Sequence, residues 1–130
     1  MSKLLWICFA GALGTGARYL VALWASDRFG TAFPYGTLIV NVVGCFLIAA
    51  VMQTALNAFA FPSTLRLTLT TGFLGGMTTY SSFAYDTLLL ARSGSRTAAL
   101  LNFSLTTLAC FGAVLLGFGA AQLWSTSAPR

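Results

Sequence analysis

The stretch Gly72-Phe73-Leu74-Gly75-Gly76-Met77-Thr78-Thr79-Tyr80-Ser81-Ser82-Phe83 decides how the rest of the sequence is interpreted. It lies inside an apolar run, from about Leu65 to Ala91, that is otherwise suited to be a membrane helix. A helix in hydrocarbon keeps its backbone groups bonded within itself, because the bilayer offers no partner. Adjacent glycines followed by hydroxyl side chains favour an interruption, since glycine leaves helical geometry readily and hydroxyls can bond freed backbone groups. We therefore predict that this helix is broken near its middle.

The glycine pair has a second interpretation. Small residues in membrane helices commonly let a neighbouring helix approach closely, without any break. Gly75 and Gly76 alone favour that interpretation, whereas the four hydroxyl and two aromatic residues that follow them favour the break. A break at membrane depth is tolerated only where protein or water surrounds it, and such breaks commonly form ion sites.

Composition places the chain in a membrane. Its 130 residues are 58% hydrophobic and 7% charged and include no histidine, with a mean hydropathy of +0.85. Such a chain has too little charge for a soluble domain of this size. Because one span takes about 20 apolar residues, we predict an all-α membrane protein in which residues 1–130 form a single four-helix transmembrane domain. The expected spans are residues 4–25, 37–58, 65–91 and 98–123.

Three polar or charged residues in these spans each leave two interpretations open. Arg18 faces a cavity or a partner, as intramembrane charges usually do, or it reaches to the nearby membrane surface. Asn41 offers two donors to an ion path, or it makes an interhelical hydrogen bond that only holds the bundle together. Asp86, near the end of the third span, is a vestibule group of an ion path or, more often, an ordinary interfacial charge.

Spacing groups other residues on common helix faces. Asn102, Thr106 and Cys110 follow at i, i+4 and i+8, which predicts a polar stripe along one face of the fourth span. Tyr80 and Phe83 are three residues apart and share a face, where positive ring edges attract an anion or, more commonly, the rings only pack in the core. All three cysteines lack metal-ligand spacing and are expected to behave as small apolar residues: Cys8, Cys45 and Cys110.

Three motifs together closely resemble the Fluc (CrcB) family of fluoride channels. They are the stretch 72–83, Gly36-Thr37-Leu38-x-Val40-Asn41-x-x-Gly44 and Gly11-x-x-Gly14-x-x-x-Arg18-Tyr19. The resemblance covers all four spans and implies a fluoride-selective channel that passively exports fluoride and lowers its toxicity in the cytoplasm. It also implies a bacterial inner-membrane location, and an antiparallel, dual-topology homodimer with two pores at its interface and a structural sodium ion at its centre.

The resemblance also assigns roles by position. It places the sodium ion on the backbone carbonyls of Gly75 and Thr78, and it matches Arg18 to the arginine of the family's first motif. We expect structural or vestibule roles for Arg18 and Asp86. Two pore positions depart from the family pattern, because Tyr80 stands where phenylalanine is usual and Cys110 where a hydroxyl is commoner. The residues expected to line the pores are Asn41, Tyr80, Ser81, Ser82, Phe83, Asn102, Thr106 and Cys110.

Chemistry separates this function from its rivals. Fluoride is small and strongly hydrated, so a path for it must replace water with donors that bind weakly enough to release the ion. A proton-coupled drug exporter needs an intramembrane carboxylate, but the chain has no glutamate and only Asp27 and Asp86 as acids. With no histidine or paired carboxylates for acid–base work, we do not expect an enzyme. A non-conducting membrane subunit remains an alternative.

Charge counting predicts how the chain is oriented. With four spans, one side of the membrane carries Lys3, Arg66 and Arg130, and the other carries Arg28, Arg92 and Arg96. Membrane proteins orient by an excess of lysine and arginine on the cytoplasmic side, and here neither side has an excess. We therefore expect insertion in both orientations, which suits two opposed copies that pair about a two-fold axis in the membrane plane.

Overall fold

The computed structural model describes residues 2–57 and 61–127, with side chains described for residues 2–56 and 61–124. Every regular element in these ranges is helical, and the three long helices are α1 (Ser2–Phe29), α2 (Tyr35–Asn57) and α6 (Arg96–Ser127). These are the helices of the described chain that are long and apolar enough to cross a membrane. The prediction of an all-α membrane protein is thereby confirmed. Ala58 and Arg130, which the predicted spans and the charge count include, lie outside the described residues.

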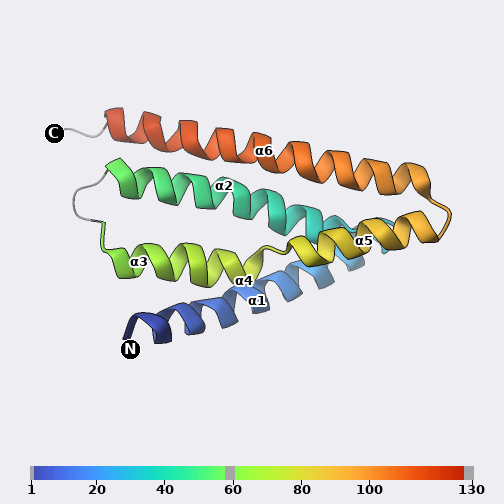
Figure 1. Ribbon diagram of the computed structural model, residues 1–130, viewed down its shortest axis with the longest axis horizontal. Helices are drawn as coiled ribbons and strands as arrows, with labels where there is room; N and C mark the ends of the chain where they lie inside the picture. Colours follow the sequence, from blue (N-terminus) through green and yellow to red (C-terminus); the bar gives the residue numbers. More distant parts are fainter. Residues whose placement is uncertain (1, 58–60, 128–130) are drawn as a thin grey trace.

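The third predicted span is divided into four consecutive elements. They are α3 (Ser63–Leu67), the π-helical η1 (Thr68–Leu74), α4 (Gly75–Met77) and α5 (Tyr80–Arg92). Thr78 and Thr79 are extended, with φ/ψ of −84°/156° and −154°/114°, so the helix stops and restarts there. Figure 1 shows the interruption as a short unwound link between α4 and α5. The prediction of a helix broken near its middle is confirmed, with the threonines as the residues that leave helical geometry.

The neighbouring glycines bring α1 against the broken segment. Gly76 remains in helical geometry, and a Cβ added to it would overlap the backbone of Gly11. A Cβ on Gly14 would likewise overlap the carbonyl of Phe73. Both interpretations of the glycine-rich stretch therefore apply, to different residues. Gly76 allows the close approach, and the two threonines make the break.

The two halves of the broken segment pack against different helices. α2 lies along α6, α1 lies along η1 and α4, and α5 packs on α6 (Figure 1). The start of α1, the end of α6 and the start of α3 lie at one end of the molecule, while the α5–α6 turn lies at the other. Glycines with positive φ close the two turns at that far end, Gly30 at 78° and Gly94 at 87°.

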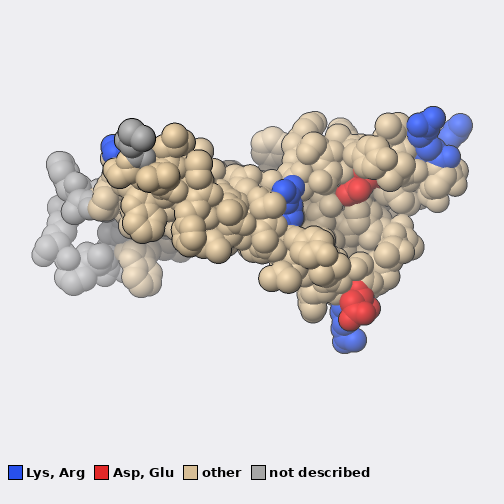
Figure 2. All heavy atoms as spheres, turned by 90° about the horizontal axis from the view of Figure 1, so that it is seen from below, with Lys and Arg blue, Asp and Glu red and all other residues tan. Residues whose placement is uncertain are grey.

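The outer surface is apolar. Large side chains such as Leu5, Phe111 and Trp124 are more than half exposed on the single chain. Figure 2 shows few charged side chains on one face, and most of them lie towards its periphery. Exposure of this extent suits contact with lipid or with another membrane-embedded chain.

Candidate functional site

Asn41 on α2 bonds to the backbone of the unwound link at Thr79. Its amide Nδ2 donates to the carbonyl of Thr79 at 3.0 Å, and its Oδ1 accepts from the Thr79 backbone N–H at 2.8 Å. The side chain is buried, with 8% of its surface exposed. It therefore replaces, from a neighbouring helix, the bonds that the broken helix cannot make itself. The interhelical bond expected as one interpretation of Asn41 is present, and its amide nitrogen carries a second N–H beyond this bond.

Thr79 starts the second half of the broken helix. Its Oγ1 accepts from the Ser82 backbone N–H at 3.2 Å, which is the usual N-cap contact of a threonine. The same hydroxyl lies 3.2 Å from Ser81 Oγ and donates to Ser82 Oγ at 3.1 Å. The hydroxyls of Thr79, Ser81 and Ser82 therefore lie together at the N-terminus of α5, beside Asn41, where the helix dipole is positive.

The break leaves two backbone carbonyls without their regular helical donors. In a continuous helix the N–H of Thr79 would bond to the carbonyl of Gly75, and the N–H of Ser82 to that of Thr78. Here those two N–H groups donate to Asn41 and to the Thr79 hydroxyl instead. Gly75 is exposed and Thr78 half-buried on the single chain.

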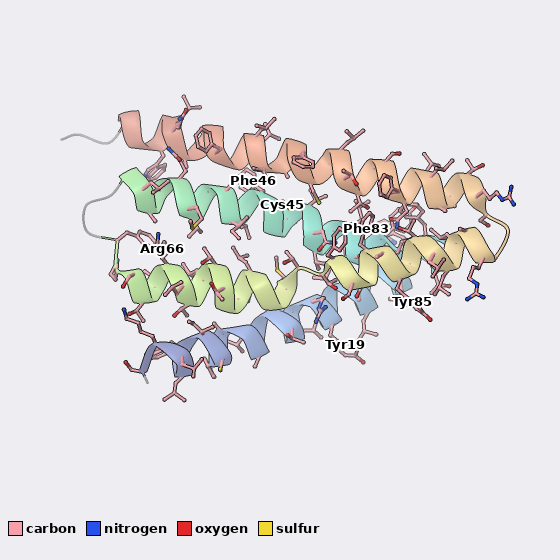
Figure 3. The ribbon with its side chains drawn as sticks, in the orientation of Figure 1. Tyr19, Cys45, Phe46, Arg66, Phe83 and Tyr85 are labelled. Atoms are coloured by element: carbon pink, nitrogen blue, oxygen red, sulfur yellow. The ribbon has the colours of Figure 1, made fainter. Side chains whose placement is uncertain are left out.

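A cavity of about 290 Å³, which we call the central cavity, adjoins the break. Its walls come from α2, from α5 with the unwound link, and from α6, and Figure 3 shows Cys45 and Phe83 at this place. Five residues predicted for the pore meet here. The lining residues are Asn41, Cys45, Thr78, Thr79, Tyr80, Phe83, Thr106, Thr107, Cys110 and Phe111.

The two predicted aromatic residues are in contact but differ in burial. The ring centroids of Tyr80 and Phe83 lie 5.6 Å apart, which confirms that they share a face. Phe83 is only 5% exposed and stacks on Phe103 of α6 at 6.1 Å, whereas Tyr80 is 78% exposed. Phe83 is therefore fixed by its own chain, and Tyr80 lies open at the mouth of the central cavity.

The polar stripe on α6 is present and extends onto α5. Thr106 donates to Asn102 Oδ1 at 3.3 Å, and Asn102 Nδ2 donates to the hydroxyl of Thr87 at 2.8 Å. Asn102 is fully buried and does not line the central cavity, whereas Thr106 and Cys110 do. The stripe thus has one end inside the helix interface and the other in the cavity wall.

Arg18 faces a second cavity of about 290 Å³, which we call the arginine cavity. The side chain is half-buried, and Thr15, Thr37, Thr79 and Ser82 add hydroxyl groups to the same walls. Its place in this wall agrees with the cavity interpretation of Arg18, and both interpretations stay open. Since Thr79 lines both the arginine cavity and the central cavity, the two are neighbours on either side of the break.

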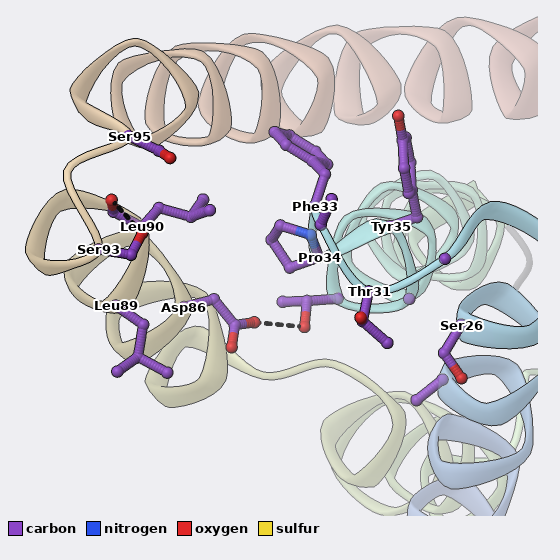
Figure 4. Close-up of a pocket in the computed structure, with 15 residues that line it drawn as sticks. Ser26, Thr31, Phe33, Pro34, Tyr35, Asp86, Leu89, Leu90, Ser93 and Ser95 are labelled. Carbon is purple, nitrogen blue, oxygen red and sulfur yellow. Dashed lines mark hydrogen bonds between the residues drawn. The ribbon is translucent and has the colours of Figure 1, made fainter.

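Asp86 faces a larger cavity of about 700 Å³ at the end of the molecule, the outer cavity. Thr37 donates to its Oδ2 at 2.8 Å, and Figure 4 shows Asp86 pointing into this space. Thr37 lines both the outer and the arginine cavity. Three neighbouring cavities therefore follow one another from the α5–α6 end to the break.

Some predicted site residues are not brought into the central cavity. Ser82 lines the arginine cavity, while Ser81 is exposed, with its Oγ 3.2 Å from Thr79 Oγ1. Conversely, sequence reasoning did not single out Cys45, Thr87 or Phe103 for this site. The signal for Cys45 was available, because it lies four residues after Asn41 and so on the same helix face.

Comparisons with known proteins agree on one family. Residues 5–118 match the family described as CrcB-like protein, Camphor Resistance (CrcB). A "Fluoride-specific ion channel FluC" from Anaeromyxobacter dehalogenans is 50% identical over 113 residues, which are 87% of this chain and 90% of that protein. Proteins of the same name from Sorangium cellulosum (45% over 122 residues, 94% and 96% of the two chains) and Geobacter metallireducens (46% over 116 residues, 89% and 94%) are also similar.

Proposed function

This chain belongs to the CrcB family, and from that premise we propose that it is a fluoride channel of the bacterial inner membrane that lets fluoride leave the cell passively. The observation that carries the proposal is the break at Thr78 and Thr79, held by Asn41 beside a cavity of neutral donors. Its relatives are named for fluoride specificity. A passive channel needs no intramembrane carboxylate that exchanges protons, in contrast to a proton-coupled exporter.

The three neighbouring cavities suggest the order of the path. Fluoride enters through the outer cavity, where the bond from Thr37 holds the Asp86 carboxylate to one wall. Arg18 then attracts the ion, in a cavity that also offers the hydroxyl of Ser82. A fixed positive charge at this point lowers the cost of bringing an anion into a low-dielectric region.

At the break the ion meets neutral groups. Thr79 lies between the arginine cavity and the central cavity, and Asn41 has a second amide hydrogen to offer there. The edge of Phe83, which carries partial positive charge, lines the same cavity. Weak neutral donors of this kind replace part of the hydration shell without holding the ion permanently.

A structural sodium ion fits the freed carbonyls. Alkali cations prefer oxygen ligands, and carbonyls at unwound membrane segments commonly supply them. The carbonyls of Gly75 and Thr78 lack their regular helical donors, and Gly75 lies at the surface of the single chain. Both would complete the shell of an ion that two copies of the chain share.

An antiparallel homodimer supplies the rest of the pore walls. Tyr80 is 78% exposed beside the central cavity, and the surrounding helix faces are apolar. A second copy would cover these groups, and the balanced basic residues allow it to insert in the opposite orientation. The two-fold axis would place one pore on each side of the shared sodium ion, and neither copy alone would enclose a path.

The test is ion efflux from liposomes that contain the purified protein. We expect fluoride to leave the liposomes rapidly and chloride to be largely retained. Equal fluoride and chloride efflux would refute a fluoride-selective channel, and the absence of any efflux would favour the non-conducting subunit. Efflux that requires a proton gradient would favour a coupled exporter.

A further inference from the structure

Cys45 and Cys110 form a pair of thiols in the wall of the central cavity. Cys45 comes from α2 and Cys110 from α6, and both side chains are half-buried and line that cavity. The two thiols reach one cavity from two helices that pack against each other, and both are free rather than joined in a disulfide. Figure 3 shows the place of Cys45 on α2, next to α6. The third cysteine, Cys8, lies exposed on α1 and does not belong to this pair.

We propose that Cys45 and Cys110 form a two-thiolate binding site for a soft divalent cation, with the mercuric ion as the probe, and that an ion bound there blocks the channel. Binding of the metal depends only on the two cysteine side chains. Block of the channel rests on the proposed function, because it requires that fluoride pass through the central cavity.

Ligand chemistry selects the kind of ion. Thiolates are soft ligands that favour soft metal ions over hard ones. A tetrahedral site would need further ligands, but the described residues include no group of three or more His, Cys, Asp or Glu side chains that could hold a metal ion. Two thiols that line one cavity without a third such ligand therefore suit a cation that accepts two ligands in a nearly linear arrangement, as the mercuric ion does.

Charge balance favours a divalent ion in this place. Each thiol gives up its proton to water as its sulfur bonds to the metal, so one divalent ion replaces two protons and the product is neutral. No electrons are exchanged and no oxidant is needed. A neutral complex avoids the cost of leaving a net charge in a low-dielectric region. A monovalent ion with two thiolates would leave a negative charge there.

The position of the pair explains why binding would stop conduction. Cys110 lies on the same stripe of α6 as Thr106, and Cys45 lies one turn from Asn41 on α2. A metal ion bridging the two sulfurs would join α2 to α6 inside a cavity of about 290 Å³. It would occupy part of the space beside the Asn41 amide and restrict movement of both walls.

The experiment uses the full chain carrying Cys8→Ser, so that only the two cavity thiols remain. After mercuric chloride treatment and desalting, mass spectrometry should count one mercury per chain, and a thiol reagent should find neither cysteine reactive. In the same background, Cys45→Ala and Cys110→Ser should each bind mercury about 100-fold more weakly, because the second of two linked ligands acts at a high effective concentration. Two mercury ions per chain, or equal binding by the single-thiol variants, would overturn the site.

Fluoride efflux supplies the second readout, normalised to each variant's own rate before metal is added. Efflux through the Cys8→Ser protein should stop with mercuric chloride and return with dithiothreitol, while both single-thiol variants keep conducting at that concentration. Full conduction by a protein that holds one bridging mercury would overturn the block. If no variant conducts before metal is added, the proposed function fails, and the mercury count still decides the site.

Discussion

The broken segment meets α1 along one seam and meets α2 and α6 along another. In the first, the glycine seam, Gly11 and Gly14 of α1 let backbone touch the backbone around Phe73 and Gly76. In the second, the polar seam, buried or half-buried amides and hydroxyls make the contacts: Asn41, Thr79, Thr87, Asn102 and Thr106. The glycine seam leaves no room, whereas the polar seam contains the central cavity.

The two seams therefore have different roles: the glycine seam positions a helix, and the polar seam serves ion conduction. Close backbone contact fixes where the first half of the broken helix lies, and a channel gains nothing from polar groups there. Polar side chains hold the second half through a few directed bonds, and the Asn41 amide keeps a second N–H beside the central cavity. We therefore expect changes in the glycine seam to alter stability, and changes in the polar seam to alter conduction first.

The largest effect should come from Asn41→Asp in the polar seam. An ionised carboxylate cannot donate to the Thr79 carbonyl and would repel an approaching anion. Fluoride efflux should fall about 100-fold or more, since repulsion between two nearby charges is worth several kcal/mol even when partly screened. Gel filtration of the same protein checks that it still assembles. A variant that conducts like the parent would show that Asn41 only holds the helices together.

The glycine seam can be broken by a single methyl group. Gly14→Ala should lower stability by about 1–3 kcal/mol, because the added Cβ overlaps the Phe73 carbonyl. Gly16→Ala, two residues away on the same helix, meets no atom within 4 Å and is the matched control. Thermal unfolding in detergent measures both variants. Equal stability of the two would mean that the seam relaxes and does not fix the helix.

Substitutions of the two aromatic residues beside the polar seam test whether their ring edges contribute to conduction. Phe83→Ile and Tyr80→Ile each lose a ring edge, and we expect efflux to drop about tenfold for each, a loss of roughly 1.4 kcal/mol. Tyr80→Phe keeps the edge and should stay close to the parent rate. A severe loss in Tyr80→Phe would assign the contact to the hydroxyl instead.

The smallest effect is expected at the outer cavity. Thr37→Val removes the hydrogen bond to Asp86 and should cost about 0.5–1.5 kcal/mol of stability, with a modest fall in efflux as the carboxylate is released. Thr37→Ser keeps the hydroxyl and should match the parent in both measurements. If Val and Ser behave alike, the bond to Asp86 has no role in the path.

Local sequence patterns predicted the break and the polar stripe, because each depends on composition or on the period of one helix. The run of hydroxyls after Gly76 indicated the interruption, and spacing placed Thr106 and Cys110 on one face. Contacts between helices were harder to predict, since they depend on how each helix is rotated about its axis. The meeting of Cys45 and Cys110 in one cavity wall, and the stacking of Phe83 on Phe103, therefore emerged only from the structure.

The length of α5 bears on how the protein is made. With 13 residues at about 1.5 Å each, α5 reaches roughly 20 Å, short of a hydrocarbon core about 30 Å thick. During biosynthesis the apolar run from Leu65 to Ala91 is long enough to enter the bilayer as one continuous helix. Asn41 can exchange bonds with Thr79 only after α2 has docked. The ion site is therefore expected to be a late product of maturation, completed inside the membrane after all segments have been inserted.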